Sequence, residues 1–220
     1  MVCTGSPPPL GFASGNPLPS ERHGPSSNAG VRRDRTVVVY DDWAGMAATR
    51  AWWLLTDHGH PDVRVLDGGW SWWARSGQDM ETGEANPEDG DLTPDPGHLP
   101  VVDADGAAQV AREGVLLDAR AGERYRGDTE PVDPVAGHVP GAVNVPTAAN
   151  LDDGRFRPVA ELAEVYAATD GVQEVAAYCG SGVTATHDLF ALALLGRLAA
   201  LYPASWSGWV SDPRHPVETS

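Results

Sequence analysis

Two short apolar runs, separated by a helix-forming segment, mark the first ordered part of the chain. Residues 36–40 are rich in β-branched side chains, residues 46–55 contain helix-forming Ala and Leu, and residues 63–66 form a second apolar run. β-Branched residues favour strands, whereas Ala and Leu favour helices. The pattern therefore predicts a strand, a helix and a strand, which together form a βαβ unit.

The same alternation continues in the second half of the chain. It predicts a helix at 103–112, a strand at 115–118, a long polar loop after residue 118, a helix at 161–168, a strand at 174–178 and a helix at 183–195, ended by Gly196. Strands that alternate with helices build an open, mainly parallel sheet. The predicted fold class is α/β.

Composition divides the chain into segments. Residues 1–30 are dense in Pro, Gly, Ser and Asn and have no hydrophobic period, so we expect an irregular segment. Residues 78–97 are rich in Gly, Pro, Asp and Glu, which is typical of a linker. The predicted domains are therefore residues 31–77 and residues 98–220.

The two predicted βαβ units resemble each other, which indicates an internal repeat. Residues 37–41 match residues 175–179, and residues 66–70 match residues 201–206 at nearly the same offset, after which Trp73 matches Trp209. Asp41 stands in the first copy where Cys179 stands in the second. We therefore expect two copies of one domain, of which only the second keeps a nucleophile.

Cys179 is the candidate nucleophile. It follows a predicted strand and begins the loop Cys179-Gly180-Ser181-Gly182-Val183-Thr184, which leads into a predicted helix. Backbone N–H groups of such a loop and the positive end of the helix favour a thiolate over a thiol. The alternative interpretation is that Cys179 is a small buried apolar residue, as most free cysteines are.

Charge and hydropathy limit the candidate partners. A formal net charge of −16 repels a phosphate backbone and an anionic membrane surface, so neither nucleic acid nor membrane is expected as a partner. The longest apolar stretch, residues 189–202, contains Gly196 and Arg197 and is too short to cross a bilayer. The start of the chain has no secretory pattern. We expect a cytoplasmic protein that acts on small molecules.

Five motifs resemble one known family. The Cys179 loop is similar to the active loop of the tandem rhodanese family, the 3-mercaptopyruvate and thiosulfate sulfurtransferases. The other motifs follow that family's second-domain order: Leu117-Asp118-Ala119-Arg120, Arg124-Tyr125-Arg126-Gly127, Gly137-His138-Val139-Pro140-Gly141-Ala142 and Tyr202-Pro203-Ala204-Ser205-Trp206. The resemblance covers residues 31–220. It implies two rhodanese-like domains, each a mainly parallel sheet flanked by helices, with the first domain incomplete.

The resemblance implies a sulfurtransferase. Cys179 would take a sulfane sulfur from 3-mercaptopyruvate or thiosulfate as a persulfide and pass it to a thiol or to cyanide, which is covalent catalysis that needs no cofactor. By resemblance Ser181 polarises the substrate, although it could simply bond the loop backbone. The anion cradle would consist of Gly180, Gly182, Val183 and Thr184.

Arg124 resembles an arginine that grips the donor carboxylate, a task that suits a guanidinium fork. The alternative is a surface salt bridge to Glu123 or Asp128. The family's second carboxylate-binding arginine has no evident counterpart within residues 131–135. By resemblance Asp118 and Arg120 brace the site without acting in catalysis.

Other readings of the sequence remain open. His138, within the Gly-His-Val-Pro-Gly turn, is expected to fix that turn rather than act as a base. A cysteine-dependent phosphatase needs an arginine six residues after the cysteine, where this chain has Ala185. The rival from another class is a catalytically silent binding or sulfur-carrier module. His58 and His60 lack a partner cluster, so no metal site is predicted.

Overall fold

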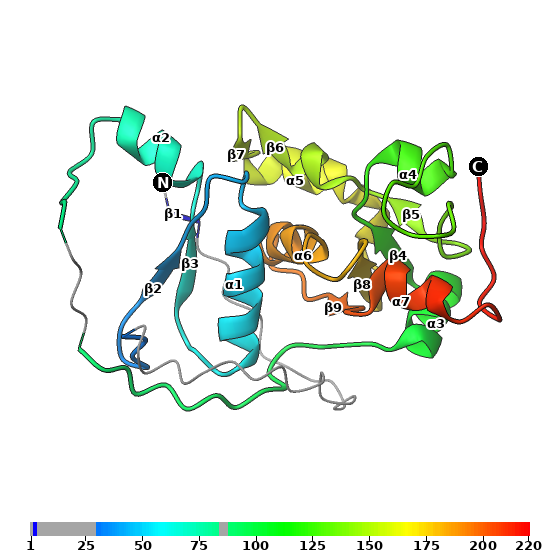
Figure 1. Cartoon of the computed structure of the whole chain (residues 1–220), viewed down its shortest axis with the longest axis horizontal. Coiled ribbons are helices and arrows are strands. Elements are labelled where there is room, and N and C mark those ends of the chain that lie inside the picture. The colour runs from blue at the N-terminus through cyan, green and yellow to red at the C-terminus, as the bar shows by residue number, and fades with distance from the viewer. Residues whose placement is uncertain (1, 4–29, 84–87) are drawn as a thin grey trace. The chain divides into compact units, whose positions relative to one another are not determined.

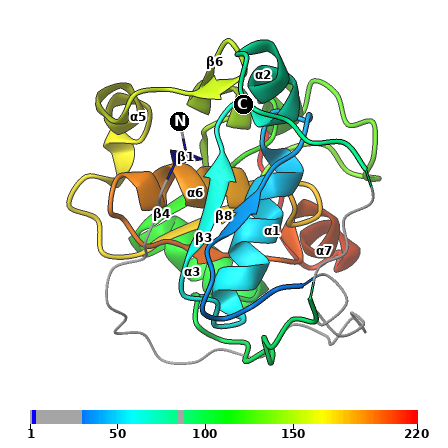
Figure 2. The same ribbon diagram turned by 90° about the vertical axis from the view of Figure 1, so that its left-hand side faces the viewer.

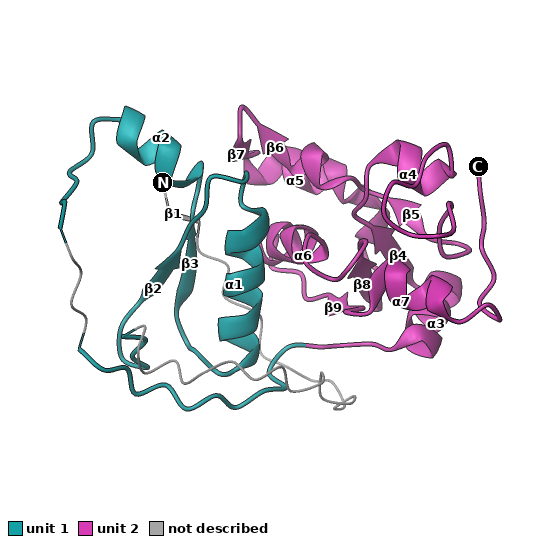
Figure 3. Cartoon of the chain, viewed as in Figure 1, with its two compact units in different colours: residues 1–4, 16–99 teal, residues 5–15, 100–220 magenta. Residues whose placement is uncertain are grey.

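The computed structural model describes residues 2–3, 30–83 and 88–220 (Figure 1). Their contacts divide the chain into unit 1, residues 1–4 and 16–99, and unit 2, residues 5–15 and 100–220 (Figure 3). The division falls between Leu99 and Pro100, so the described residues of the predicted linker, 78–83 and 88–97, belong to unit 1. They form no helix or strand. The domain bounds drawn from the sequence stay a prediction.

Unit 1 contains one small sheet with α1 beside it. Its elements are β1 (Val2–Cys3), β2 (Val37–Val39), α1 (Met46–Asp57), β3 (Val63–Leu66) and α2 (Gly69–Arg75). The strand order is β1-β3-β2, in which β2 runs parallel and β1 antiparallel to β3. Figure 2 shows β2 and β3 side by side next to α1, which packs against both strands. This is the predicted βαβ unit.

The predicted irregular segment at residues 1–30 is mostly outside the described residues. Its described residues Val2 and Cys3 form β1 and pair with Leu66 and Val65. That part of the prediction is wrong, because a two-residue strand is too short to leave a period in the sequence.

Unit 2 is built around a parallel sheet with the strand order β5-β4-β8-β9. Its helices and strands are α3 (Ala104–Glu113), β4 (Val115–Asp118), α4 (Gly122–Arg126), β5 (Val143–Asn144), η2 (Thr147–Asn150), β6 (Leu151–Asp152), β7 (Arg155–Phe156), α5 (Val159–Val165), η3 (Ala167–Thr169), β8 (Val175–Tyr178), α6 (Ala185–Leu194), β9 (Ala200–Leu201) and α7 (Ser205–Ser211). β6 and β7 form a separate antiparallel pair.

The sheet of unit 2 is covered on both faces, which explains why β8 is apolar along its whole length. Ala176 and Tyr178 share one buried cluster with side chains of α3 and α7, including Val110 and Trp206. Successive strand residues point to opposite faces, so Ala177 faces the other way. Helix α6 packs against β8 and β9. In Figure 1, α6 lies on one side of β8, and α3 and α7 lie on the other.

The long polar loop predicted after residue 118 is wrong in detail. The segment contains α4, β5, η2, β6 and β7, each two to five residues long. Elements of that length leave no measurable hydrophobic period. The helices predicted at 161–168 and 183–195 are present as α5 and α6 with bounds shifted by up to three residues, which is common at helix ends.

Candidate active site

Cys179 lies at the carboxyl end of β8. Residues 180–184 lead from it into α6, so the N-terminus of a ten-residue helix follows the thiol. The residue is buried, with 1 % of its surface exposed, and its thiol is free. Carboxyl ends of parallel strands are where open α/β sheets place their ligands. The fold therefore puts the predicted nucleophile where such proteins carry out chemistry.

The start of α7 holds the backbone of the Cys179 loop. The N–H of Cys179 donates to Ser205 Oγ over 3.1 Å, and the N–H of Trp206 donates to the carbonyl of Cys179 over 3.0 Å. Ser205 reaches this position with φ of +52°, a conformation that is rare for a residue other than glycine. The strained serine thus fixes the backbone of the candidate nucleophile.

Gly182 gives the loop its turn. Its φ is +75°, and a Cβ atom there would lie 2.3 Å from the carbonyl oxygen of Pro203. Both the conformation and the close approach demand glycine. Of the other predicted loop residues, Ser181 is exposed, whereas Val183 and Thr184 are half-buried.

Asp118 and Arg120 form a buried ion pair beside the loop. Asp118 ends β4 and pairs in register with Tyr178, so its carboxylate lies one strand away from the Cys179 turn. Arg120 Nη2 donates to Asp118 Oδ2 over 2.6 Å, and Arg120 Nε donates to Asp118 Oδ1 over 3.0 Å. Burial opposes the charged guanidinium, but the bonds to Asp118 outweigh it and raise the pKa of Arg120.

Arg124 comes from α4, and its guanidinium lies next to Gly180 of the loop. A Cβ atom on Gly180 would lie 3.7 Å from both Nη1 and Nη2 of Arg124. Arg124 forms its ion pair with the buried Glu130, at 2.6 Å from Nη2 to Oε1, and not with Glu123 or Asp128. Asp128 pairs instead with Arg126 on the exposed side of α4. The salt-bridge partners considered from the sequence are therefore wrong, because Glu130 is brought in by the loop that follows α4.

A chain of contacts links Arg124 to the backbone of Cys179. Glu130 Oε2 accepts hydrogen bonds from both Arg120 Nη1 and Arg124 Nε. The Arg120 guanidinium lies 4.5 Å from the centre of the Trp206 ring, a cation–π distance, and the Trp206 backbone in turn bonds Cys179. Burial would raise the pKa of Glu130, but hydrogen bonds from Arg124 and from backbone N–H groups lower it. Two arginine side chains are thus held beside the Cys179 loop.

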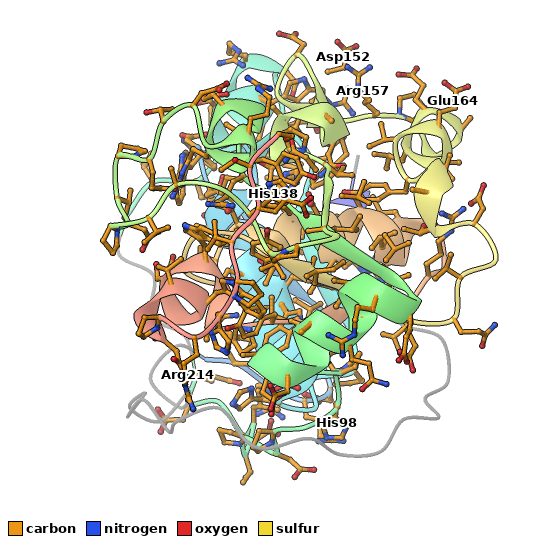
Figure 4. All side chains as sticks on the ribbon, turned by 90° about the vertical axis from the view of Figure 1, so that its right-hand side faces the viewer. His98, His138, Asp152, Arg157, Glu164 and Arg214 are labelled. Carbon is orange, nitrogen blue, oxygen red and sulfur yellow. The ribbon has the colours of Figure 1, made fainter. Side chains whose placement is uncertain are left out.

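His138 is engaged in the turn that contains it. Its Nδ1 lies 2.7 Å from the carbonyl oxygen of Tyr125, and its ring stacks on the Tyr125 ring at 3.7 Å. Its backbone pairs with Glu218, so in Figure 4 it lies beside the segment leading to the C-terminus. These contacts support the turn-fixing role expected from the sequence.

A buried polar network behind the loop was not predicted. Asn150 Nδ2 lies 3.1 Å from Nδ1 of His187 and donates to Asp188 Oδ1 over 2.9 Å, while Tyr166 donates to Asn150 Oδ1 over 2.8 Å. His187 and Asp188 lie in the first turn of α6, directly after the Cys179 loop. Burial raises the pKa of Asp188 to about 8, against the effect of the hydrogen bond from Asn150.

The sequence offered little signal for the missed residues. Glu130 and Asn150 lie in irregular or very short elements, and the contact from Asn150 to Asp188 spans 38 residues. The one usable signal is charge, because Asp188 is the one carboxylate of a mostly apolar helix and a carboxylate there needs a partner. Within the described ranges, no group of three or more His, Cys, Asp or Glu side chains could hold a metal ion. Nor is any helix of those ranges long and apolar enough to cross a membrane.

Comparison with known proteins gives two matched regions. The model of the rhodanese-like domain matches residues 12–76 and residues 103–212. The second region contains Cys179 and every other predicted site residue. The first contains Asp41, in agreement with the repeat found in the sequence.

Named relatives and a solved structure agree with that match. A Pseudomonas aeruginosa protein named as a 3-mercaptopyruvate sulfurtransferase is 48 % identical over 86 % of this chain and 70 % of its own length. A Mycobacterium tuberculosis protein named as a thiosulfate sulfurtransferase is 46 % identical over 92 % of this chain and 74 % of its own. The structure of 3-mercaptopyruvate sulfurtransferase SseA from Escherichia coli matches with a TM-score of 0.70 and 31 % identity, over 82 % of this chain and 70 % of that chain. The chain therefore belongs to the rhodanese-like family of sulfurtransferases.

Proposed function

We propose that this protein transfers a sulfane sulfur from 3-mercaptopyruvate or thiosulfate to a thiol or to cyanide, through a persulfide on Cys179. One observation carries the proposal. Cys179 is a free thiol between the carboxyl end of β8 and the N-terminus of α6, in a loop whose backbone is fixed by Ser205 and Trp206. The names of the two relatives supply the two candidate donors.

The reaction divides into two displacements at sulfur. The Cys179 thiolate attacks the sulfane sulfur of the donor, and the bond between that sulfur and the rest of the donor breaks. The electron pair leaves with pyruvate, as its enolate that then takes up a proton, or with sulfite. The acceptor, as a thiolate or cyanide, then attacks the outer sulfur of the persulfide and regenerates the Cys179 thiolate, so no redox cofactor is needed.

The site residues take separate roles in this proposal. Positive potential at the start of α6 and the N–H groups of residues 180–184 stabilise the negative charge that sulfur carries during the two displacements. Arg124 binds the anionic donor, and Ser181, which is exposed on the loop, orients it. Asp118, Arg120 and His138 keep the surrounding loops in place.

The test is thiocyanate formation from cyanide with each donor in turn. Cys179→Ser should lower kcat by about a thousandfold or more, because a serine hydroxyl cannot form the persulfide. Cys3→Ser is the matched control, since Cys3 is the other cysteine of the sequence, and it should leave the rate unchanged. An active Cys179→Ser variant would exclude the proposal. A wild-type chain that forms a stable persulfide but turns over no acceptor would be a sulfur carrier instead.

The proposal extends to location and partners. A nucleophilic thiol must stay reduced, which favours the cytoplasm over an oxidising compartment. The net charge of −16 disfavours nucleic acid as a partner. Cell fractionation of the producing organism tests the first point.

A further inference from the structure

Glu130 binds one edge of the Arg124 guanidinium. Arg124 Nε donates to Glu130 Oε2 over 3.1 Å, and Arg124 Nη2 donates to Glu130 Oε1 over 2.6 Å. This is the two-bond geometry in which a guanidinium binds a carboxylate most firmly. The Glu130 side chain is 3 % exposed, so water competes little for these bonds. The Nε–Nη2 edge of Arg124 is therefore fully occupied within the protein.

The other edge of Arg124 faces the loop of Cys179. A Cβ atom on Gly180 would lie 3.7 Å from Nη1 and 3.7 Å from Nη2, so the Nη1–Nη2 edge is directed at a position that has no side chain. Among the hydrogen bonds of the described residues, none uses Arg124 Nη1. A second carboxylate can bind this edge without displacing Glu130, because a guanidinium has five N–H donors.

Asp133 is a second carboxylate that could bind Arg124 in place of Glu130. Its Oδ2 lies 3.6 Å from Arg124 Nη2, beyond hydrogen-bond distance, and has no hydrogen-bond partner among the described residues. The Asp133 side chain is only 8 % exposed. A guanidinium released from Glu130 would turn toward this carboxylate, because a buried charge without a bond is unfavourable. The Nη1–Nη2 edge would then no longer be fixed toward Gly180.

We propose that Glu130 is a positioning residue, which holds Arg124 so that its Nη1–Nη2 edge receives the anionic group of the sulfur donor above Gly180. The proposal rests on the proposed function and deepens it. Glu130 itself does not touch the donor. Gly180 contributes the space, and Arg124 contributes the hydrogen bonds.

Glu130 could instead repel the anionic donor, and neutralising it would then change donor binding in the opposite direction. Arg120 and Arg124 carry two positive charges, while Asp118, Glu130 and Asp133 carry three negative charges, so this group has a net charge of −1 when all five are ionised. If Glu130 acted mainly as a repelling charge, its neutralisation would strengthen the binding of an anion. If it positions Arg124, neutralisation weakens that binding. The sign of one measured change distinguishes the two roles.

The first experiment compares Glu130→Gln with wild type in steady-state kinetics. We expect KM for 3-mercaptopyruvate to rise roughly tenfold, the effect of losing one charge-assisted interaction, with kcat within about twofold. Arg126→Gln is the matched control. Arg126 lies on the same helix in an exposed ion pair with Asp128, so its loss should change neither constant. Thermal unfolding of each variant reports whether the fold is kept.

The second experiment needs no sulfur transfer. The rate at which Cys179 is alkylated by anionic iodoacetate is divided by the rate with neutral iodoacetamide. Glu130→Gln should lower this ratio several-fold. Gly180→Ala should lower it too, because its methyl group would fill the space before Arg124 without backbone strain or a contact shorter than 3.7 Å. Arg126→Gln should leave the ratio unchanged.

The outcomes separate this inference from the proposed function. A lower alkylation ratio in Glu130→Gln, from a chain that turns over neither donor, would support the positioning of Arg124 and count against the sulfurtransferase reaction. A raised or unchanged ratio would overturn the positioning role, even in an active enzyme. A fall in kcat and stability without a change in KM or in the ratio would also overturn it, since that is the result of a purely structural role.

Discussion

The loops after β2 and β8 occupy the same place in the two units but carry different residues, Asp41 and Cys179, at the same position. In unit 1 the loop begins with Asp41, whose carboxylate accepts hydrogen bonds from the N–H groups of Trp43, Gly45, Ala47 and Ala48 at 2.7–2.9 Å. In unit 2 the loop begins with Cys179. The first loop thus contains an internal anion bound by backbone N–H groups, whereas the second begins with a residue that can carry a transferred sulfur.

The return segments of the two units match as well. The N–H of Trp70 donates to the carbonyl of Asp41 over 3.3 Å, as the N–H of Trp206 does to the carbonyl of Cys179. Gly69, with φ of +67°, stands where unit 2 has Ser205. The shared backbone arrangement therefore belongs to the fold, and the chemistry depends on which side chain begins the loop.

The two units also differ in the first turns of α1 and α6, and a substitution there should have the largest effect on stability. Their fourth residues are Thr49 and Asp188, and both are fully buried. The pKa of Asp188 is raised from 3.8 to about 8. The folded chain therefore holds a proton that the unfolded chain releases, so this group favours folding fully below about pH 4 and loses its contribution as the pH rises toward 8.

The substitution Asp188→Asn should remove this pH-dependent loss of folding stability. The variant should gain stability relative to wild type as the pH rises from 5 to 8, by at most about 4 kcal/mol over that range. Thermal unfolding at several pH values measures the change. Asp105→Asn, at an exposed position in the first turn of α3, is the control and should show no such trend. Equal curves for Asp188→Asn and wild type would show that Asp188 ionises normally.

An intermediate effect is expected at Asp41. Asp41→Asn keeps one acceptor oxygen but turns an amide NH₂ toward backbone N–H groups that had a carboxylate, so unit 1 should lose about 2 kcal/mol. Chemical denaturation measures the loss. Asp42→Asn is the control because Asp42 accepts one such bond, from the N–H of Ser71, and should lose about half as much. Equal losses would mean that the Asp41 loop is not held by its carboxylate.

The smallest effect on stability is expected at Ser205. Ser205→Gly gives unit 2 the residue that unit 1 has at the corresponding position and relieves the strain at φ of +52°. It also removes the acceptor of the Cys179 N–H. The two effects oppose each other, so the free energy of unfolding should change by less than about 1 kcal/mol. Cys179 alkylation, in contrast, should change clearly, and an unchanged rate would count against a role for Ser205 in holding the loop.

The sequence was sufficient to predict the strand, loop and helix that carry Cys179. The run Val175–Tyr178, the glycines after it and the helix-forming segment that follows predict β8, the loop and α6, because each has a local physical signal. The match between residues 37–41 and 175–179 likewise predicts a second loop of the same kind. These features depend on neighbours in the chain, so they are visible without a structure.

The supports of the site were not predictable in the same way. Glu130 joins Arg120 and Arg124 only because the loop after α4 folds back on itself, and Asn150 meets Asp188 only because η2 packs against α6. The strained Ser205 binds the N–H of Cys179, a residue 26 positions away in the chain. Such contacts depend on tertiary structure, for which one sequence carries no periodic signal.

The pairing of His138 with Glu218 has a practical consequence for handling the protein. Glu218 exchanges two backbone hydrogen bonds with His138, and Thr219 lies so close to Gly127 that a side chain there would contact it at 2.7 Å. The final residues are thus part of the folded structure, next to the turn that contains His138. A flexible spacer between Ser220 and a purification tag would leave this pairing undisturbed.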